Sequence, residues 1–169
     1  MWRTALWRQL GAAIDMLDDA LRGCPDELWT ADVWEDRSAP GLGAYWYLAY
    51  HALFWLDRDL SGSDDGFRPP EPFGLEEMDP AGQLPPRVYT RDELRAYLAH
   101  CRRKCQSTIA AVSDDQLARS CRVGSGELPF AELLLYTMRH VQEHAAQLHT
   151  FLGQRTGSAG GWVRAARDA

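Results

Sequence analysis

The chain of 169 residues has 24 acidic and 18 basic side chains, which gives a net charge of −6. Because no stripe of Arg or Lys follows any segment, nucleic acid is not an expected partner. A hydrophobic content of 46% can fill the core of one domain. No segment approaches the roughly 18 uncharged apolar residues of a membrane span, and charges interrupt the N-terminal apolar pattern. We therefore expect a cytoplasmic protein with no membrane partner.

Four segments place apolar residues at steps of three and four, the period of an amphipathic helix. The predicted helices cover residues 2–22, 42–61, 90–112 and 128–152. Gly62 is suited to end the second helix, and Gly153 and Gly157 to end the last. Thr90 and Glu93 have the spacing of a capping box, which is expected at the start of the third helix.

The connections between these helices are long. Residues 24–41 contain two Pro, so we expect a crossover connection with at most one short helical turn near Pro25. Residues 61–89 contain six of the nine prolines, which suits an ordered surface loop. A short turn begins at Asp114, and no segment alternates as a strand would. We predict an all-α fold, a four-helix bundle with long connecting loops, and its helix order in space stays open.

The predicted bundle domain covers residues 1–155. The tail at 156–169 is mostly small or charged, and Trp162 is the side chain in it that could dock on the bundle. Exposed aromatic and Leu side chains on the helices would suit a homodimer.

Histidines on two predicted helices indicate a metal site. His140 and His144 are one turn apart and project from the same face of the last helix. An imidazole binds Zn²⁺ at about 2.0–2.1 Å, so a rigid helix can hold two ligands that one ion bridges. His51 interrupts the apolar face of the second helix. A single inward His is more often a core residue, but three inward rings each need a partner, and this favours metal binding.

Other side chains on the same two faces are expected beside the metal. They are Tyr47 and Trp55 on the second helix, as walls of the pocket, and Thr137 and Gln147 on the last helix. Glu143 lies three residues from His140, where it could accept a proton from water on the metal. More often such a Glu is simply solvated.

The segment from His140 to His144 also fits H-x-x-E-H, the pattern of inverted zinc proteases. These enzymes need a further acidic ligand well downstream, and Asp168 is the only acid after His144. We therefore reject a protease. The sequence also has no Glu-x-x-His pattern of a di-iron bundle and no glycine-rich phosphate loop.

The chain resembles the DinB/YfiT-like four-helix bundle proteins of bacteria over nearly its whole length. The resemblance rests on the inward His51 in AYWYLAYHALFWLDRDL and on the H-x-x-x-H-x-x-Q motif of His140, His144 and Gln147. It implies that the three histidines bind a divalent metal, commonly Zn²⁺ or Ni²⁺, with water completing the shell. It also implies a hydrolase or a thiol-dependent transferase. The family commonly has Arg-Gly before the Gln, where this chain has two Ala, and the ligands are intact.

Three protein ligands with an open position are typical of a catalytic metal site. We expect a metal-dependent hydrolase, or a transferase with a low-molecular-weight thiol as co-substrate, and a small-molecule substrate that enters near residues 61–89. The alternative is a non-catalytic bundle that holds a structural metal, or none, and serves as a binding or interaction module.

Overall fold

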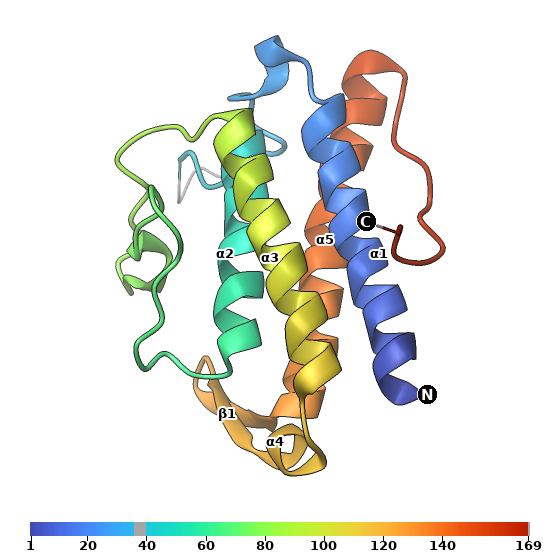
Figure 1. Cartoon of the computed structure of the whole chain (residues 1–169). Helices are drawn as coiled ribbons and strands as arrows, with labels where there is room; N and C mark the ends of the chain where they lie inside the picture. Colours follow the sequence, from blue (N-terminus) through green and yellow to red (C-terminus); the bar gives the residue numbers. More distant parts are fainter. Residues whose placement is uncertain (36–39, 169) are drawn as a thin grey trace.

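The computed structural model describes residues 1–35 and 40–168, so the predicted crossover at 24–41 and the end of the predicted tail lie partly outside the described residues. Within them, four long helices form a bundle (Figure 1). They are α1 (Trp2–Gly23), α2 (Tyr45–Ser61), α3 (Arg91–Ala111) and α5 (Phe130–Thr156). The predicted all-α four-helix bundle is confirmed.

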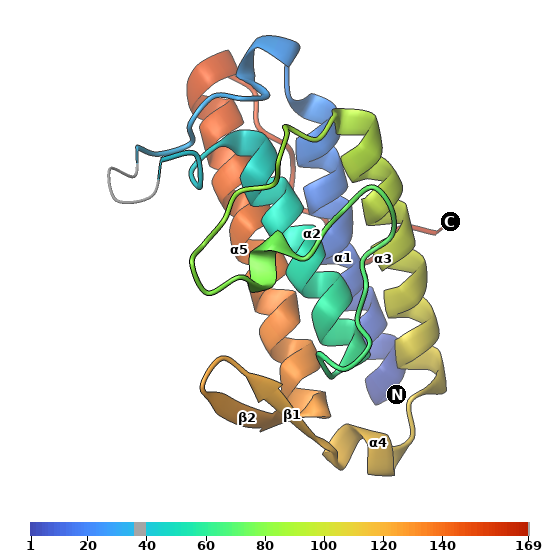
Figure 2. The same cartoon turned by 90° about the vertical axis from the view of Figure 1, so that its left-hand side faces the viewer.

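The helix order follows from which helices touch. α1 packs against α3 and α5, and α2 packs against the same two helices, so α1 and α2 occupy opposite corners of the bundle. α1 and α5 run in one direction, and α2 and α3 run in the other (Figures 1 and 2). α2 and α5 are therefore antiparallel neighbours, and their facing sides form one wall of the interior.

Short elements connect the long helices. They are η1 (Asp26–Leu28), η2 (Glu76–Met78), α4 (Asp114–Ala118), and the antiparallel strands β1 (Ser120–Val123) and β2 (Gly126–Pro129). η1 is the short turn expected near Pro25, and α4 replaces the simple turn expected at Asp114. The expectation of no strands was wrong. Strands of four residues are too short to show a clear alternation, and Gly124 with φ +56° lies in the turn between them.

α2 is buried on nearly every side. The bundle covers one side, and the connection at 62–89 covers another with the buried rings of Phe67 and Phe73. The Phe73 ring stacks 5.9 Å from Tyr50 of α2 and 4.3 Å from Tyr97 of α3, between ring centroids. This explains why α2 is rich in aromatic residues on more than one face. The predicted ordered loop is thus part of the core.

The predicted caps are present except at Gly153, which lies inside α5. The side chain and backbone of Thr90 and Glu93 exchange hydrogen bonds as a capping box at the start of α3. Gly62 ends α2 with φ +66°, and Gly157 ends α5 with φ +73°. α5 therefore extends four residues beyond the predicted end at 152. Both glycines hold a left-handed backbone that other residues adopt only at a cost.

The tail after α5 runs back along α1. Val163 is the buried side chain in it, while Trp162 is 74% exposed and does not dock. The backbone N–H of Arg167 donates to the Asp15 carboxylate at 2.6 Å. The Arg167 guanidinium also pairs with the Asp19 carboxylate through both terminal nitrogens. Backbone hydrogen bonds, this ion pair and the Val163 side chain therefore hold the tail against α1.

Apolar surface gathers in a groove between α1 and α5. It has a volume of about 730 Å³, and Trp2, Leu6, Leu135 and Met138 line it. The homodimer expected from exposed apolar side chains stays a prediction. Across residues 1–35 and 40–168, no helix combines the length and the apolar character that crossing a bilayer requires.

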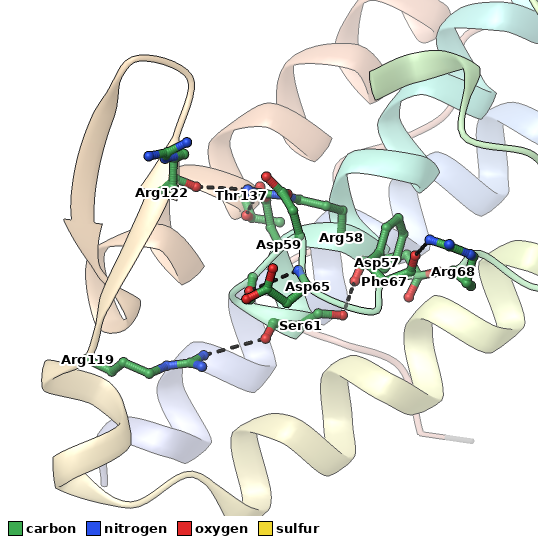
Figure 3. Close-up of polar contacts among 12 residues, drawn as sticks. Asp57, Arg58, Asp59, Ser61, Asp65, Phe67, Arg68, Arg119, Arg122 and Thr137 are labelled. Atoms are coloured by element: carbon green, nitrogen blue, oxygen red, sulfur yellow. Dashed lines mark hydrogen bonds and ion pairs between the residues drawn. The ribbon is translucent and has the colours of Figure 1, made fainter. Parts of the chain in front are cut away.

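A buried ion pair links α2 to α3. Asp57, labelled in Figure 3, is 1% exposed. Lys104, the only lysine of the chain, donates from Nζ to Asp57 Oδ1 at 2.6 Å, and the Tyr97 hydroxyl donates to Oδ2 at 3.1 Å. Removing one partner would leave a desolvated carboxylate without its counter-charge.

Lys104→Met is therefore expected to lower the free energy of unfolding by about 3 kcal/mol, because Asp57 loses its cation. Urea denaturation followed by helical circular dichroism measures this. The matched control is Arg103→Met, which removes an exposed cation from the position just before Lys104 on α3. Equal stabilities of the two variants would contradict the prediction.

Candidate metal centre

Two helices provide the three predicted histidines. His51 lies in the middle of α2, and His140 and His144 lie one turn apart on α5. Because α2 and α5 are packed neighbours, their inward faces meet and bring the three rings together. The ring centroids are 5.1 Å apart for His51 and His140, 5.0 Å for His51 and His144, and 4.6 Å for His140 and His144.

The Nε2 atoms of the three rings converge. His140 Nε2 lies 3.2 Å from His51 Nε2 and 3.0 Å from His144 Nε2. Three imidazole nitrogens that share one tetrahedral ion at about 2.0–2.1 Å stand about 3.3 Å from one another. The observed spacing is close to this value, so the donor set fits a divalent metal.

The Nδ1 atoms show where the ring protons lie. His51 Nδ1 is 2.7 Å from Glu77 Oε2, and His144 Nδ1 is 2.8 Å from Gln147 Oε1. Both oxygens are acceptors, so both Nδ1 atoms carry the proton and both Nε2 atoms present a lone pair. His140 can donate an Nε2 proton to only one of them. A cation satisfies all three lone pairs at once.

His140 differs from the other two histidines in its second ring nitrogen. Its Nδ1 is buried and has no hydrogen-bond partner among the described residues. Burial lowers the pKa of His140 to about 3, and the neighbouring charges of His144 and His51 act in the same direction. Burial, followed by the charge of His51, also lowers the pKa of His144. Both rings are therefore neutral at neutral pH, the form that binds metals.

Glu77 is a site residue that sequence reasoning missed. It comes from η2, and its side chain is 4% exposed. Its Oε2 accepts from His51 Nδ1 and from Trp55 Nε1, the latter at 2.9 Å, and the nearby Tyr47 hydroxyl helps to lower the pKa of the same carboxylate. Burial raises the pKa of Glu77, but the hydrogen bond and charge of His51 outweigh it, and the pKa lies below its ordinary value. The ionised carboxylate fixes the orientation of His51.

Some of the other predicted site residues lie beside the histidines, and others do not. Trp55 lines the cleft described below and hydrogen-bonds Glu77, and Gln147 accepts from His144 Nδ1. Tyr47, expected as a second wall, does not line that cleft and lies near the Glu77 carboxylate instead. Thr137 is buried and donates to Asp59 Oδ2 at 2.7 Å, so it supports an acid of α2 and not a histidine. Glu143 is exposed and lines a different groove, together with Trp162. None of the three histidines lines that groove.

A cleft of about 480 Å³ opens beside the histidines. His51 and His140 reach it from the two helices, Met78 and Pro80 line it from the 62–89 connection, and Val123 lines it from the hairpin. Its volume suits a small molecule. Among residues 1–35 and 40–168, no fourth His, Cys, Asp or Glu joins the three histidines. The three histidines thus form a group that could hold one metal ion, beside a cleft that gives access to it.

Glu77→Gln is expected to weaken Zn²⁺ binding by about 10- to 100-fold, because His51 loses the charged acceptor that orients it and increases its basicity. Titration of the metal-free protein against a chelating indicator measures the affinity. Glu76→Gln, the adjacent acid of the same η2 turn, is the matched control and should bind Zn²⁺ as the wild type does. Equal affinity in both variants would remove Glu77 from the site.

Comparison with known proteins agrees with this architecture. A search of curated proteins finds no match to the chain. The sequence does match the family described as the DinB superfamily over residues 9–148, a stretch that contains α2, the 62–89 connection and all three histidines. The match covers far more than half of the 169 residues, and the fold agrees with it. The chain therefore belongs to the DinB superfamily.

Proposed function

We propose that this protein binds one divalent metal ion, Zn²⁺ or Ni²⁺, through His51, His140 and His144, and that it is a metal-dependent enzyme acting on a small molecule. The reaction is hydrolysis, or transfer of a low-molecular-weight thiol to an electrophile. A bound ion in such a site supplies Lewis acidity, which lowers the pKa of water or of a thiol.

One observation carries this proposal: three imidazole Nε2 atoms converge at 3.0 and 3.2 Å beside an open cleft. Without a cation, at least one of these contacts sets two lone pairs against each other, because the Nδ1 protons of His51 and His144 are held by Glu77 and Gln147. Such an arrangement is costly in a partly buried site and favourable around an ion.

The residues around the three histidines orient two of the rings and line the cleft beside them. Glu77 keeps the proton of His51 on Nδ1, and Gln147 does the same for His144. Trp55, Met78 and Pro80 give the cleft apolar walls that would exclude water from a bound substrate. The three ligands stand on two rigid helices, so binding requires little rearrangement.

Elemental analysis of the purified, tag-free protein tests the metal. We expect about one ion per chain, lost in His140→Ala/His144→Ala, because removing two of three ligands leaves no chelate. His100→Ala is the control. This ring is outside the cluster, with Nε2 3.4 Å from Asp57 Oδ1, and its variant should keep the metal.

The same three proteins, checked for helical content, separate the two reaction classes. A hydrolase accelerates ester cleavage of 4-nitrophenyl acetate, and a thiol transferase accelerates the coupling of a small thiol to 1-chloro-2,4-dinitrobenzene. Either activity should disappear with the metal and survive in His100→Ala. A wild type that takes up neither Zn²⁺ nor Ni²⁺ would overturn the proposal and favour a non-catalytic module.

A further inference from the structure

The cleft beside the histidines contains several charged side chains in addition to the metal site. They are Arg58, Asp59, Asp64, Glu77, Asp79 and Arg122. A small molecule that enters the cleft meets these charges, so which of them are already paired decides what the cleft can bind.

Each of the three guanidinium nitrogens of Arg58 donates a hydrogen bond. Its Nε donates to Asp64 Oδ1 at 2.6 Å, and one terminal nitrogen donates to Asp59 Oδ1 at 3.0 Å. The other terminal nitrogen donates to the backbone carbonyl of Arg122 at 2.9 Å, as Figure 3 shows. With 5% of its side chain exposed, Arg58 is a structural cation that joins α2 to the hairpin.

The acids of the cleft are also engaged. Asp59 accepts from Arg58 and Thr137, and Asp64 accepts from Arg58. Glu77 holds His51 and Trp55. Asp79 Oδ1 accepts the backbone N–H of residue 81 at 2.8 Å and so stabilises its own turn.

Arg122 is different. Its side chain is exposed, and its guanidinium makes no hydrogen bond or ion pair with any of the residues that the structure describes. The residue opposite it in the hairpin is Glu127, whose carboxylate instead accepts from Ser120 Oγ at 2.7 Å. Arg58 fixes the backbone of Arg122 at the edge of the cleft, and the exposed side chain that extends from it has unused donors.

We propose that Arg122 binds the carboxylate of the small molecule whose reactive group enters at the three histidines, an inference that rests on the proposed function. A guanidinium pairs with a carboxylate through two parallel hydrogen bonds. A single unpaired cation among four acids matches one negative charge better than the two of a phosphate. Apolar walls from Met78 and Val123 suit an alkyl or acyl chain between the two ends of the ligand.

The size of the cleft limits the length of that chain. A sphere of the observed 480 Å³ is roughly 10 Å across, which fits a small molecule of a few carbon atoms between its reactive group and its carboxylate. Tyr136, one helical turn before His140 on α5, also lines the cleft and offers its hydroxyl to such a ligand.

The test uses Co²⁺-loaded protein and two series of thiols of two to six carbons, one ending in a carboxylate and the other in an alcohol. Absorption from sulfur-to-Co²⁺ charge transfer reports binding without any turnover. At the favourable length, the acid should bind about 10-fold tighter than the alcohol, a typical effect of a hydrogen-bonded ion pair. Arg122→Gln should abolish this preference.

Arg119→Gln is the matched control, because Arg119 is an exposed arginine beside the same hairpin that does not line the cleft. It should keep the preference for the acid. Equal binding of acids and alcohols by the wild type, a preference that survives Arg122→Gln, or Co²⁺ absorption that no thiol changes would overturn this inference alone. Tighter binding of a phosphonate of the same length would overturn the choice of carboxylate. Failure to take up Co²⁺ would overturn the proposed function as well.

Discussion

The packing of α2 against α5 is the contact on which the site depends. It joins His51 of one helix to His140 and His144 of the other, and the spacings of 5.1 and 5.0 Å between the His51 ring and these two rings exist only while the two helices stay in register. α2 is held in place from both sides, by the bundle and by the rings of the 62–89 connection. Burial of this helix therefore also fixes the site.

The 62–89 connection has two roles that share a physical cause. Its aromatic side chains complete the core, and this burial orders the backbone that carries Glu77 to His51. A carboxylate is positioned accurately only on an ordered segment, since its hydrogen bond to an imidazole depends on direction. The loop is thus a structural part of the site, although it contributes no metal ligand.

The hairpin of β1 and β2 is likewise fixed by a buried group of α2, and it lines the cleft beside the histidines. Arg58 is almost completely desolvated, and its hydrogen bonds tie α2 to the carbonyl of Arg122. A buried cation of this kind requires all its donors to be paired, and the hairpin provides one of the acceptors. The histidines and the backbone of Arg122 therefore lie at different parts of one cleft, and the buried Arg58 keeps their positions relative to each other constant.

The sequence by itself determined the four helices, their caps and the pairing of His140 with His144, because helical periodicity, capping boxes and one-turn spacings are local relationships. It also indicated His51, through a polar residue on an apolar face. The tertiary structure alone decided which helices are neighbours, because connections as long as 62–89 allow several arrangements. It also decided the roles of Glu77 and Arg122. Those side chains lie in a loop and a short hairpin whose positions depend on burial against distant helices, which no local pattern encodes.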